Sequence, residues 1–263
     1  MAEDLDDFAD FARSLAAAAR LETLPGSRDR WDRAENKLAE GFDPVTASDR
    51  NSEAAIRRLI EARFPEHAIS GEEYADRPGA GRWSWSIDPI DGTRAYICGL
   101  PSWTTLIALL DGGDPVLGIV DVPRLDELYL GHGREALVFA SRGERRPLAT
   151  SGCASLSEAR LSTTDPYLFA GPEAEGFERL RRSARLTRFG LDAYGYALVA
   201  AGTLDVVAES GLKPHDYNAL VPLVRAAGGS VSNWSGGSDL GEGRIVAAAS
   251  EALLEEACRL LGG

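Results

Sequence analysis

Two aspartates three residues apart are the residues of this sequence best suited to chemistry. Asp88 and Asp91 follow Trp83–Ile87, a run typical of a buried strand, so both carboxylates are expected where that strand ends. Gly92 comes next and permits a tight turn or the close approach of a ligand. A lone Asp is usually a solvated loop residue, but on such a turn two carboxylates and the carbonyl of Ile90 can point at one centre.

An all-oxygen ligand set of this kind favours a hard divalent cation. Mg²⁺ is usually bound through one or two carboxylates together with oxygens of a substrate phosphate. Glu72 and Asp216 lie in two other acidic segments and are candidates to complete the shell. The 3 histidines and 3 cysteines lack the spacing of a zinc site, so Mg²⁺ or Mn²⁺ is the expected ion.

Phosphoryl transfer is the chemistry that such a centre would perform. Two oxygen-held ions about 3.5–4 Å apart can activate a water and stabilise the leaving oxygen. The backbone N–H groups of Gly92 and Thr93 directly follow the aspartates and are candidates to hold a phosphate oxygen. Because the ions would supply the positive charge, the site needs no basic patch.

Composition disfavours several classes of protein. The formal net charge of −13 over 263 residues argues against a nucleic-acid partner, because Lys and Arg bind phosphate backbones. Apolar runs such as Leu106–Leu110 are too short to span a bilayer, and the acidic segment 3–7 is unlike a secretion signal. Scattered cysteines suit a reducing compartment. We therefore expect a cytoplasmic protein with no nucleic-acid or membrane partner.

The elements that position these residues follow from apolar periodicity and turn residues. Helices are predicted over 5–24, 49–64, 192–201, 216–227 and 251–261. Strands are predicted over 83–87, 104–110, 116–122, 127–130, 136–140, 161–164, 204–209 and 245–249. This mixture predicts a layered α/β sandwich. A division near 141–155 would separate an N-terminal α+β lobe (1–145) with most metal ligands from a C-terminal α/β lobe (146–263) with Asp216.

Four segments together carry a family resemblance. In chain order they are Asp-Pro-Val-Thr-Ala-Ser-Asp (43–49), Phe-Pro-Glu-His-Ala-Ile-Ser-Gly-Glu-Glu (64–73), Ile-Asp-Pro-Ile-Asp-Gly-Thr (87–93), and the stretch from Asp216 to Ala-Gly-Gly (227–229). The chain resembles, over essentially its whole length, the inositol monophosphatase superfamily of Mg²⁺-dependent, lithium-sensitive phosphatases. The resemblance implies the layered αβαβα sandwich of the inositol monophosphatase and fructose-1,6-bisphosphatase type, two or three Mg²⁺ ions and a homodimer.

The resemblance also implies roles for the acidic residues. Glu72, Asp88 and the Ile90 carbonyl would hold a first metal ion. Asp88, Asp91 and Asp216 would hold a second. Glu72 would share a third ion through waters, which makes it a catalytic residue as well as a ligand. The reaction would be in-line attack by a metal-activated water.

Three further roles follow from the same resemblance. Thr93, hydrogen-bonded to Asp49, would position or activate the attacking water. The backbone amides of Gly92 and Thr93 would hold the phosphate. Glu209 corresponds to the position that contacts the alcohol or amine of the leaving group.

Within the superfamily, three stretches are most similar to the histidinol-phosphate phosphatase branch. They are Asp91–Leu110, Leu191–Ala197 and Glu209–Asp216. His215 departs from the pattern, because inositol-specific members usually have Trp there and the histidinol branch commonly has Tyr. The departure leaves the fine substrate preference open without affecting the phosphatase chemistry.

Charge favours the histidinol branch. L-Histidinol phosphate carries a cationic amine and an imidazole, which acidic residues on the leaving-group side would complement. Asp192 and Glu209 are the candidates, although Asp192 also suits a cap of the helix that follows it. The arginines within Arg181–Arg188 are either a solvated surface or a group that reaches a partner subunit's site.

The expected function is hydrolysis of L-histidinol phosphate to L-histidinol and phosphate, a late step of histidine biosynthesis. Inositol 1-phosphate or another small phosphate ester is the alternative substrate, and a sugar or nucleotide-derived bisphosphate is less favoured. A protein that binds metal and phosphate without turnover is the alternative of a different class. The joint presence of Glu72, Asp88, Asp91, Thr93 and Asp216 argues against it.

Overall fold

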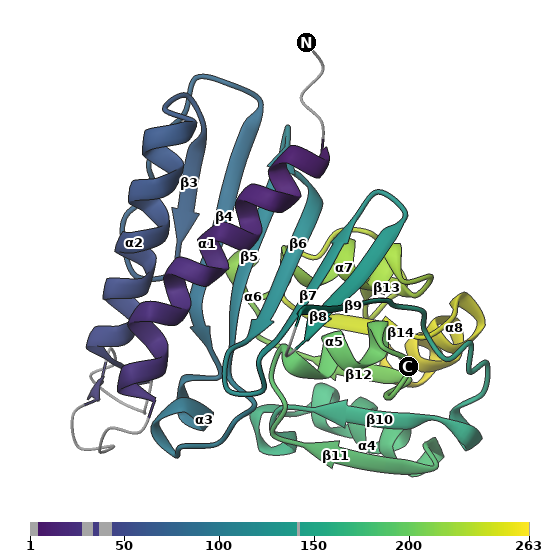
Figure 1. Ribbon diagram of the computed structural model, residues 1–263. Coiled ribbons are helices and arrows are strands. Elements are labelled where there is room, and N and C mark those ends of the chain that lie inside the picture. Colours follow the sequence, from purple (N-terminus) through teal and green to yellow (C-terminus); the bar gives the residue numbers. More distant parts are fainter. Residues whose placement is uncertain (1–4, 28–33, 37–43, 141–142, 263) are drawn as a thin grey trace.

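The computed structural model describes residues 5–27, 34–36, 44–140 and 143–262 and arranges them in five layers (Figure 1). In order, the layers are a helix pair, a seven-stranded sheet, a second helix layer, a five-stranded sheet and a last helix pair. The αβαβα sandwich expected from the sequence is confirmed. Within the described ranges, no helix is both long and apolar enough to cross a membrane.

The seven-stranded sheet has the order β3-β4-β5-β6-β7-β8-β9 and is antiparallel except for the parallel pair of β3 and β4. Its strands are β3 (Ala68–Gly71), β4 (Trp83–Asp91), β5 (Thr104–Asp111), β6 (Asp114–Val122), β7 (Glu127–His132), β8 (Glu135–Ala140) and β9 (Glu144–Pro147). Helices cover both faces of the central strands. For this reason β5 is buried along most of its length and is a nearly continuous apolar run.

Helices α1 (Leu5–Gly26) and α2 (Ala47–Arg63) cover one face of this sheet (Figure 1). Phe8 of α1 and Ile56 of α2 belong to one buried cluster with Trp85 of β4. The apolar stripe that predicted α1 is therefore the surface that packs on the sheet.

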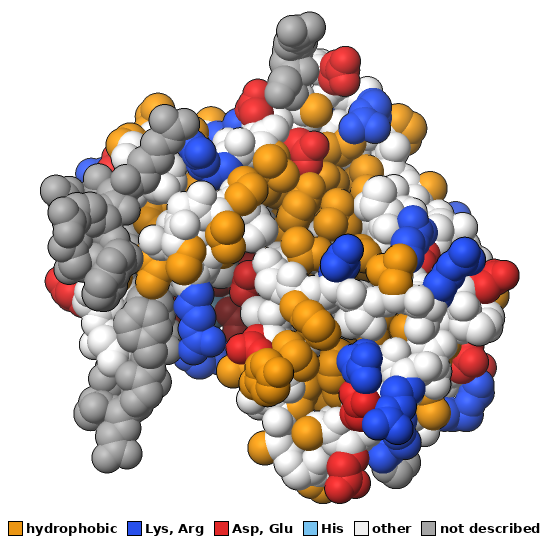
Figure 2. All heavy atoms as spheres, turned by 90° about the horizontal axis from the view of Figure 1, so that it is seen from below, with side chains coloured by type: hydrophobic (Ala, Val, Ile, Leu, Met, Phe, Trp, Pro, Cys, Tyr) orange, Lys and Arg blue, Asp and Glu red, His pale blue; other side chains and the backbone are white. Residues whose placement is uncertain are grey.

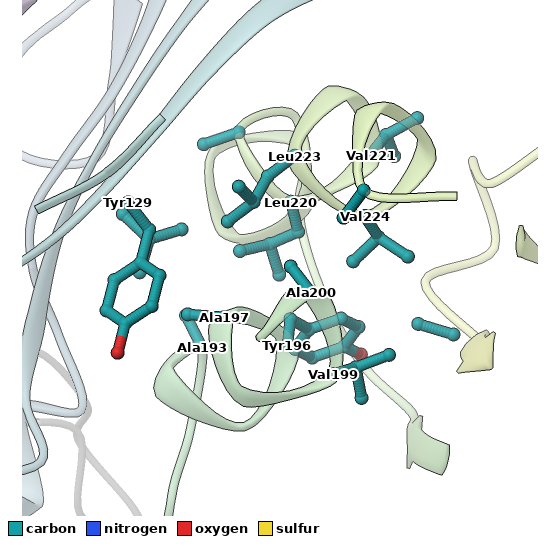
Figure 3. Packing of buried hydrophobic residues seen from close by; sticks show 14 of the residues in the cluster. Tyr129, Ala193, Tyr196, Ala197, Val199, Ala200, Leu220, Val221, Leu223 and Val224 are labelled. Carbon is teal, nitrogen blue, oxygen red and sulfur yellow. The ribbon is translucent and has the colours of Figure 1, made fainter. Parts of the chain in front are cut away.

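The middle layer consists of α5 (Tyr194–Ala200) and α7 (Leu220–Ala226), which lie between the two sheets. Figure 3 shows Leu220 and Val224 of α7 in the same cluster as Ala200 of α5. Residues of both sheets join this cluster, so the middle layer couples the two halves of the chain.

The five-stranded sheet has the order β11-β10-β12-β14-β13, with β11, β10 and β12 parallel and the other pairs antiparallel. Its strands are β10 (Arg160–Thr163), β11 (Leu186–Phe189), β12 (Val206–Glu209), β13 (Ser230–Asn233) and β14 (Ile245–Ala248). Helices α4 (Pro172–Ser183) and α8 (Glu251–Leu261) cover its outer face. The short elements are β1 (Glu35–Asn36), β2 (Pro44–Val45), α3 (Thr93–Ile97), α6 (Pro214–Tyr217) and the 3₁₀ turns Leu156–Glu158 and Pro166–Leu168.

Two predicted elements differ from the structure near the acidic residues. The strand predicted over 83–87 continues to Asp91, so both aspartates lie within β4 rather than after it. The single helix predicted over 216–227 is wrong, because α6 and α7 are separate helices. Pro222 has no N–H to donate to the carbonyl of Asn218, which prevents one continuous helix.

The remaining predicted helices and strands end within two residues of their predicted ends. Helices α3 and α4 and the short strands β1, β2, β3, β9, β11 and β13 were not predicted. The predicted division between residues 145 and 146 falls within β9, and the two-lobe organisation stays a prediction.

Two glycines set the distance between α7 and the first sheet. A Cβ atom on Gly118 of β6 would overlap the backbone of Ala219, and one on Gly131 of β7 would overlap the backbone of Leu223. The helix can approach the strands this closely only because both positions lack a side chain.

We therefore expect Gly118→Ala to lower the free energy of unfolding by about 1–3 kcal/mol, the usual effect of overpacking a core. Urea denaturation measures this change. Gly81→Ala is the matched control, because a Cβ there meets no atom closer than 3.9 Å. Equal unfolding midpoints for the two variants would contradict the close approach of α7.

Candidate active site

Three aspartates from distant parts of the chain meet at one place. Asp88 and Asp91 lie in β4, and Asp216 lies in α6. Each offers a carboxylate oxygen, and these atoms all lie within 4.8 Å of one another. Asp88 is only 2% exposed. The convergence expected of Asp88 and Asp91 is present, and Asp216 joins them.

An irregularity in β4 explains how Asp88 and Asp91 reach the same centre. In a regular strand, residues three apart point to opposite faces. The pairing of β4 with β5 shifts register between the two aspartates, as a bulge does when it redirects side chains. The N–H of Ile90 donates to Asp88 Oδ1 at 3.0 Å, and Thr105 Oγ1 donates to the Pro89 carbonyl at 2.8 Å. The side chains of Asp88 and Thr105 thus supply hydrogen-bond partners for the backbone groups of Ile90 and Pro89, which lie at the irregularity.

The second half of the chain supplies hydrogen bonds that hold two of the carboxylates. The N–H of Ala193, just before α5, donates to Asp91 Oδ2 at 2.8 Å. The N–H of Lys213, just before α6, donates to Asp216 Oδ2 at 2.7 Å. His215 Nε2 lies 3.5 Å from Asp216 Oδ1, so the residue that departs from the family pattern contacts the cluster.

Burial and repulsion raise the pKa values of the clustered carboxyls. Burial raises the pKa of Asp88 well above its ordinary value, and the next causes are the charges of Glu72, Asp91 and Asp216. Burial also raises the pKa of Asp91 strongly, with the charge of Asp192 as the next cause. The pKa of Asp216 is raised as well, again mainly by burial. The cluster therefore concentrates negative charge where water screens it poorly.

Glu72 follows β3 and belongs to the same electrostatic centre. Its negative charge raises the pKa of Asp88, of Asp91 and of Asp216. The structure thus brings Asp88, Asp91 and Asp216 together within 4.8 Å and places Glu72 close enough for its charge to act on all three, although Glu72 is not one of that group.

The donor set fits a hard divalent cation. It is made of carboxylate oxygens with the Ile90 carbonyl in the same segment, the chemistry that Mg²⁺ and Mn²⁺ prefer. In the part of the chain that the structure describes, no Lys or Arg side chain forms an ion pair with Asp88, Asp91 or Asp216. A bound cation would therefore supply the charge that relieves their repulsion.

A second group of possible ligands lies elsewhere on the molecule. It consists of Asp6 at the start of α1, His132 of β7 and Glu135 of β8. Asp6 and Glu135 are exposed, so water screens their charges. This group lacks the buried repulsion that distinguishes the aspartate cluster.

Gly92 and Thr93 lie where the short helix α3 begins. Gly92 has φ +77°, the left-handed conformation that favours glycine. A Cβ atom there would lie 3.1 Å from the carboxylate carbon of Asp192. The first N–H groups of a helix have no partner within the helix, so this position suits the predicted binding of a phosphate oxygen.

The predicted hydrogen bond between Thr93 and Asp49 is wrong. Thr93 Oγ1 instead donates to the Ile90 carbonyl at 3.1 Å. Asp49 Oδ2 accepts from the N–H and hydroxyl of Thr46 at 2.8 and 2.6 Å, which caps the start of α2. Asp49 Oδ1 is buried and has no hydrogen-bond partner among the described residues, and burial raises the pKa of Asp49 to about 6. Asp43, which opens the same sequence segment, lies outside the described residues.

A cavity of about 280 Å³ opens beside the cluster. Figure 2 shows acidic side chains inside a hollow on this side of the molecule. The volume is close to the lower end of the range for small-molecule sites. The lining residues belong to the segments 91–94, 164–168, 192–196, 209–212 and 216–220.

Glu209 and its hydrogen-bond donors form one wall of this cavity. Glu209 Oε1 accepts from the N–H of Thr164 at 2.7 Å, and Oε2 accepts from Thr163 Oγ1 at 3.2 Å. Burial raises the pKa of Glu209 to about 7 despite these bonds. The residue assigned to the leaving group thus borders the same space as the aspartate cluster.

Asp192 also lines the cavity and does not cap a helix. Helix α5 begins at Tyr194 with Ala193 as its N-cap, and no side chain caps it. Burial raises the pKa of Asp192 to about 6, and the positive charge of Arg94 opposes this increase. The capping interpretation of Asp192 is therefore wrong, and its carboxylate faces the site.

Sequence reasoning did not single out three other lining residues, which are Arg94, Thr164 and Tyr196. Tyr196 is only 1% exposed, and its hydroxyl has no hydrogen-bond partner in the part of the chain that the structure describes. An aromatic residue in an alanine-rich helix predicts only core packing, so its polar end was missed. The arginine cluster lies elsewhere, since Arg181 and Arg182 pair with Glu178 on the exposed face of α4.

Comparison with known proteins gives consistent matches. The model of the Inositol monophosphatase family matches residues 4–262. A chloroplastic bifunctional phosphatase, IMPL2 of Arabidopsis thaliana, is 39% identical over 89% of this chain, and the match spans 66% of that protein. Histidinol-phosphatase of Chlorobaculum parvum is 36% identical over 80% of each chain. The structure of an inositol monophosphatase from Zymomonas mobilis superposes with a TM-score of 0.86 at 35% identity, covering 99% of this chain and 100% of that one.

The raised pKa of Glu209 gives a testable effect of pH on stability. The pKa of Glu209 is about 7 in the folded chain and 4.5 in the unfolded chain. The stabilisation that comes from this difference is fully present below pH 4.5 and is lost as the pH rises through 7. We expect the free energy of unfolding of the wild type, relative to Glu209→Gln, to fall by about 3 kcal/mol between pH 4 and pH 8. Urea denaturation in the presence of a chelator measures this difference.

Glu144→Gln, on the exposed strand β9, is the control for this measurement. Its stability should track the wild type within about 0.5 kcal/mol across the pH range. Parallel pH profiles for the wild type and Glu209→Gln would show that burial does not hold the Glu209 proton.

Proposed function

The chain belongs to the inositol monophosphatase family, and from that premise we propose that this metal-dependent phosphatase hydrolyses L-histidinol phosphate to L-histidinol and phosphate. One observation carries the proposal. The cavity beside the cluster of Asp88, Asp91 and Asp216 is also lined by two further acids, Asp192 and Glu209. The three aspartates suit cations that bind a phosphate, and Asp192 and Glu209 suit a leaving group with positive charge.

The family resemblance suggests how the ligands would be shared among the cations, and the carboxylate cluster is compatible with that assignment. One Mg²⁺, or Mn²⁺ in its place, would be held by Glu72, Asp88 and the carbonyl of Ile90, and another by Asp88, Asp91 and Asp216. A third would contact Glu72 through water. When bound, these ions polarise the phosphate and lower the pKa of a nearby water. The high pKa values of the free carboxyls mean that binding displaces protons, so affinity should rise with pH.

The other residues of the site orient the reactants. The N–H groups of Gly92 and Thr93 bind phosphate oxygens at the start of α3. The Thr93 hydroxyl donates a hydrogen bond to the Ile90 carbonyl at 3.1 Å. The lone pairs of the hydroxyl oxygen are therefore free to accept a hydrogen bond from an attacking water. Glu72 takes the proton of that water. Asp49, whose pKa is about 6, is a second proton acceptor near Asp88.

The leaving group binds between Asp192 and Glu209. L-Histidinol has an ammonium group and an imidazole, and both are hydrogen-bond donors when protonated. Asp192, with a pKa of about 6, is mostly ionised at neutral pH and pairs with the ammonium group. Glu209, with a pKa of about 7, carries a partial charge and can accept from the imidazole or donate to it.

A neutral polyol phosphate such as inositol 1-phosphate is the second candidate. The partly protonated Glu209 can also hydrogen-bond a hydroxyl group, and the Zymomonas mobilis relative is an inositol monophosphatase. This alternative uses the same cation site and differs only on the leaving-group side.

With L-histidinol phosphate as the substrate, we further propose that the protein acts in histidine biosynthesis as a homodimer in the cytoplasm.

Phosphate release by the purified protein with Mg²⁺ tests the substrate. We expect kcat/KM for L-histidinol phosphate to exceed that for inositol 1-phosphate and fructose 1,6-bisphosphate by roughly a hundredfold, about 2.7 kcal/mol. A flat profile would move the assignment to a broader phosphatase. Absence of release from any of the three would favour binding without turnover.

Two substitutions separate the chemistry from the specificity. Asp91→Asn should lower kcat at least about a thousandfold with every substrate, because it removes a proposed ligand while keeping the side-chain shape.

Asp192→Asn keeps the backbone conformation at φ +48°, which Asn tolerates well. It should raise KM for L-histidinol phosphate about tenfold and leave hydrolysis of an aryl phosphate, whose leaving group carries no positive charge, nearly unchanged. Equal losses on both substrates would remove Asp192 from the specificity role.

A further inference from the structure

An ion pair with a fully buried carboxylate lies in α2, outside the residues assigned so far. Glu53 is 0% exposed, and its Oε1 accepts from Arg57 Nε at 2.7 Å. Burying two charges costs more free energy than an apolar pair of the same size would, so this pair is weak evidence for stability alone. Its other hydrogen bonds indicate what it positions.

Those bonds all go to the segment that carries Glu72. The second oxygen of Glu53, Oε2, accepts from the backbone N–H of Glu73 at 2.7 Å. A Cβ atom on Gly71 would overlap the Glu53 carboxylate, so the backbone on the other side of Glu72 also lies against it. Arg57 extends the contact, because its two terminal nitrogens donate to the carbonyls of Tyr74 and Ala75, each at 3.2 Å.

The segment 71–75 has little regular structure of its own to hold it. It begins at Gly71, the last residue of β3, where pairing with β4 ends, and the next named strand in the chain begins at Trp83. Backbone groups outside helices and strands need other partners when they are partly buried. Glu53 and Arg57 supply three such partners from a helix that packs against β4 (Figure 1).

We propose that Glu53 and Arg57 are positioning residues for the cation site, because they fix the backbone on both sides of Glu72 and so aim its carboxylate at the aspartate cluster. The inference rests on the proposed function, in which Glu72 is a cation ligand. Residues that orient metal ligands typically change affinity by about 10–100-fold when they are altered. The pair therefore sets cation affinity and contributes less to the chemical step.

Glu53→Gln tests this inference, since it keeps the side-chain shape and removes the charge. We expect Mn²⁺ binding, measured directly by electron paramagnetic resonance without substrate, to weaken at least about tenfold. The Mg²⁺ concentration for half-maximal phosphate release should rise by a similar factor. At saturating Mg²⁺, kcat should return to within about threefold of the wild type.

Asp121→Asn is the matched control. Asp121 is also 0% exposed and pairs with an arginine, Arg20, but this pair joins α1 to β6. The other hydrogen bonds of Arg20 go to Asp126 and the Glu127 carbonyl. The control should lose stability as Glu53→Gln does while binding Mn²⁺ like the wild type. Equal Mn²⁺ affinity in Glu53→Gln and the wild type, or equal loss in Glu53→Gln and Asp121→Asn, would overturn the proposal.

Arg57→Lys provides a second variant if Glu53→Gln does not fold. Lysine keeps the positive charge but has one nitrogen in place of the three that bond Glu53, Tyr74 and Ala75, so it cannot reproduce the fork geometry of the guanidinium. It should weaken Mn²⁺ binding in the same direction, and unchanged binding would overturn the role of the pair. Absence of Mn²⁺ binding by the wild type would instead refute the cation site itself, which separates the two failures.

Discussion

Repulsion among buried carboxylates is the constraint on which the rest of the site depends. Three aspartates lie with carboxylate oxygens within 4.8 Å, and burial and neighbouring charges raise the pKa values of all three. Such a cluster destabilises a fold at neutral pH unless protons or cations compensate for it. Its presence at the edge of a cavity is therefore better explained by function than by stability.

The fold imposes this arrangement by drawing on several layers at once. The irregular end of β4 directs Asp88 and Asp91 to the same side, which a regular strand would not do. The backbone N–H of Ala193, ahead of α5, then holds Asp91 from the other half of the chain, while the N–H of Lys213 holds Asp216 locally at the start of α6. Glycines at positions 118 and 131 let α7 approach the first sheet closely, and α6 lies just before α7. The site therefore depends on packing between the two sheets.

Much of this was predictable because local sequence determines it. The apolar stripe of α1 predicted the first helix, and four short motifs, among them the one around Asp88 and Asp91, predicted the family and supplied the residues proposed to bind cations. The break between α6 and α7 and the capping role of Asp49 were not foreseen, although the sequence carries a local signal for each: Pro222 lies inside the predicted helix, and Thr46 precedes Asp49 at the spacing of a capping box. The unpartnered hydroxyl of Tyr196 and the contacts of Glu53 depend on tertiary packing, which periodicity alone does not specify.

The most direct test of the cation site is anomalous diffraction from crystals grown with Mn²⁺. The aspartate cluster should hold Mn²⁺ bonded to Asp88, Asp91 and Asp216, with a further peak beside Glu72, and these peaks should weaken when Mn²⁺ is replaced by a chelator. Absence of any peak there, or Mn²⁺ only at the exposed group of Asp6, His132 and Glu135, would contradict the assignment of the cluster as the catalytic cation site.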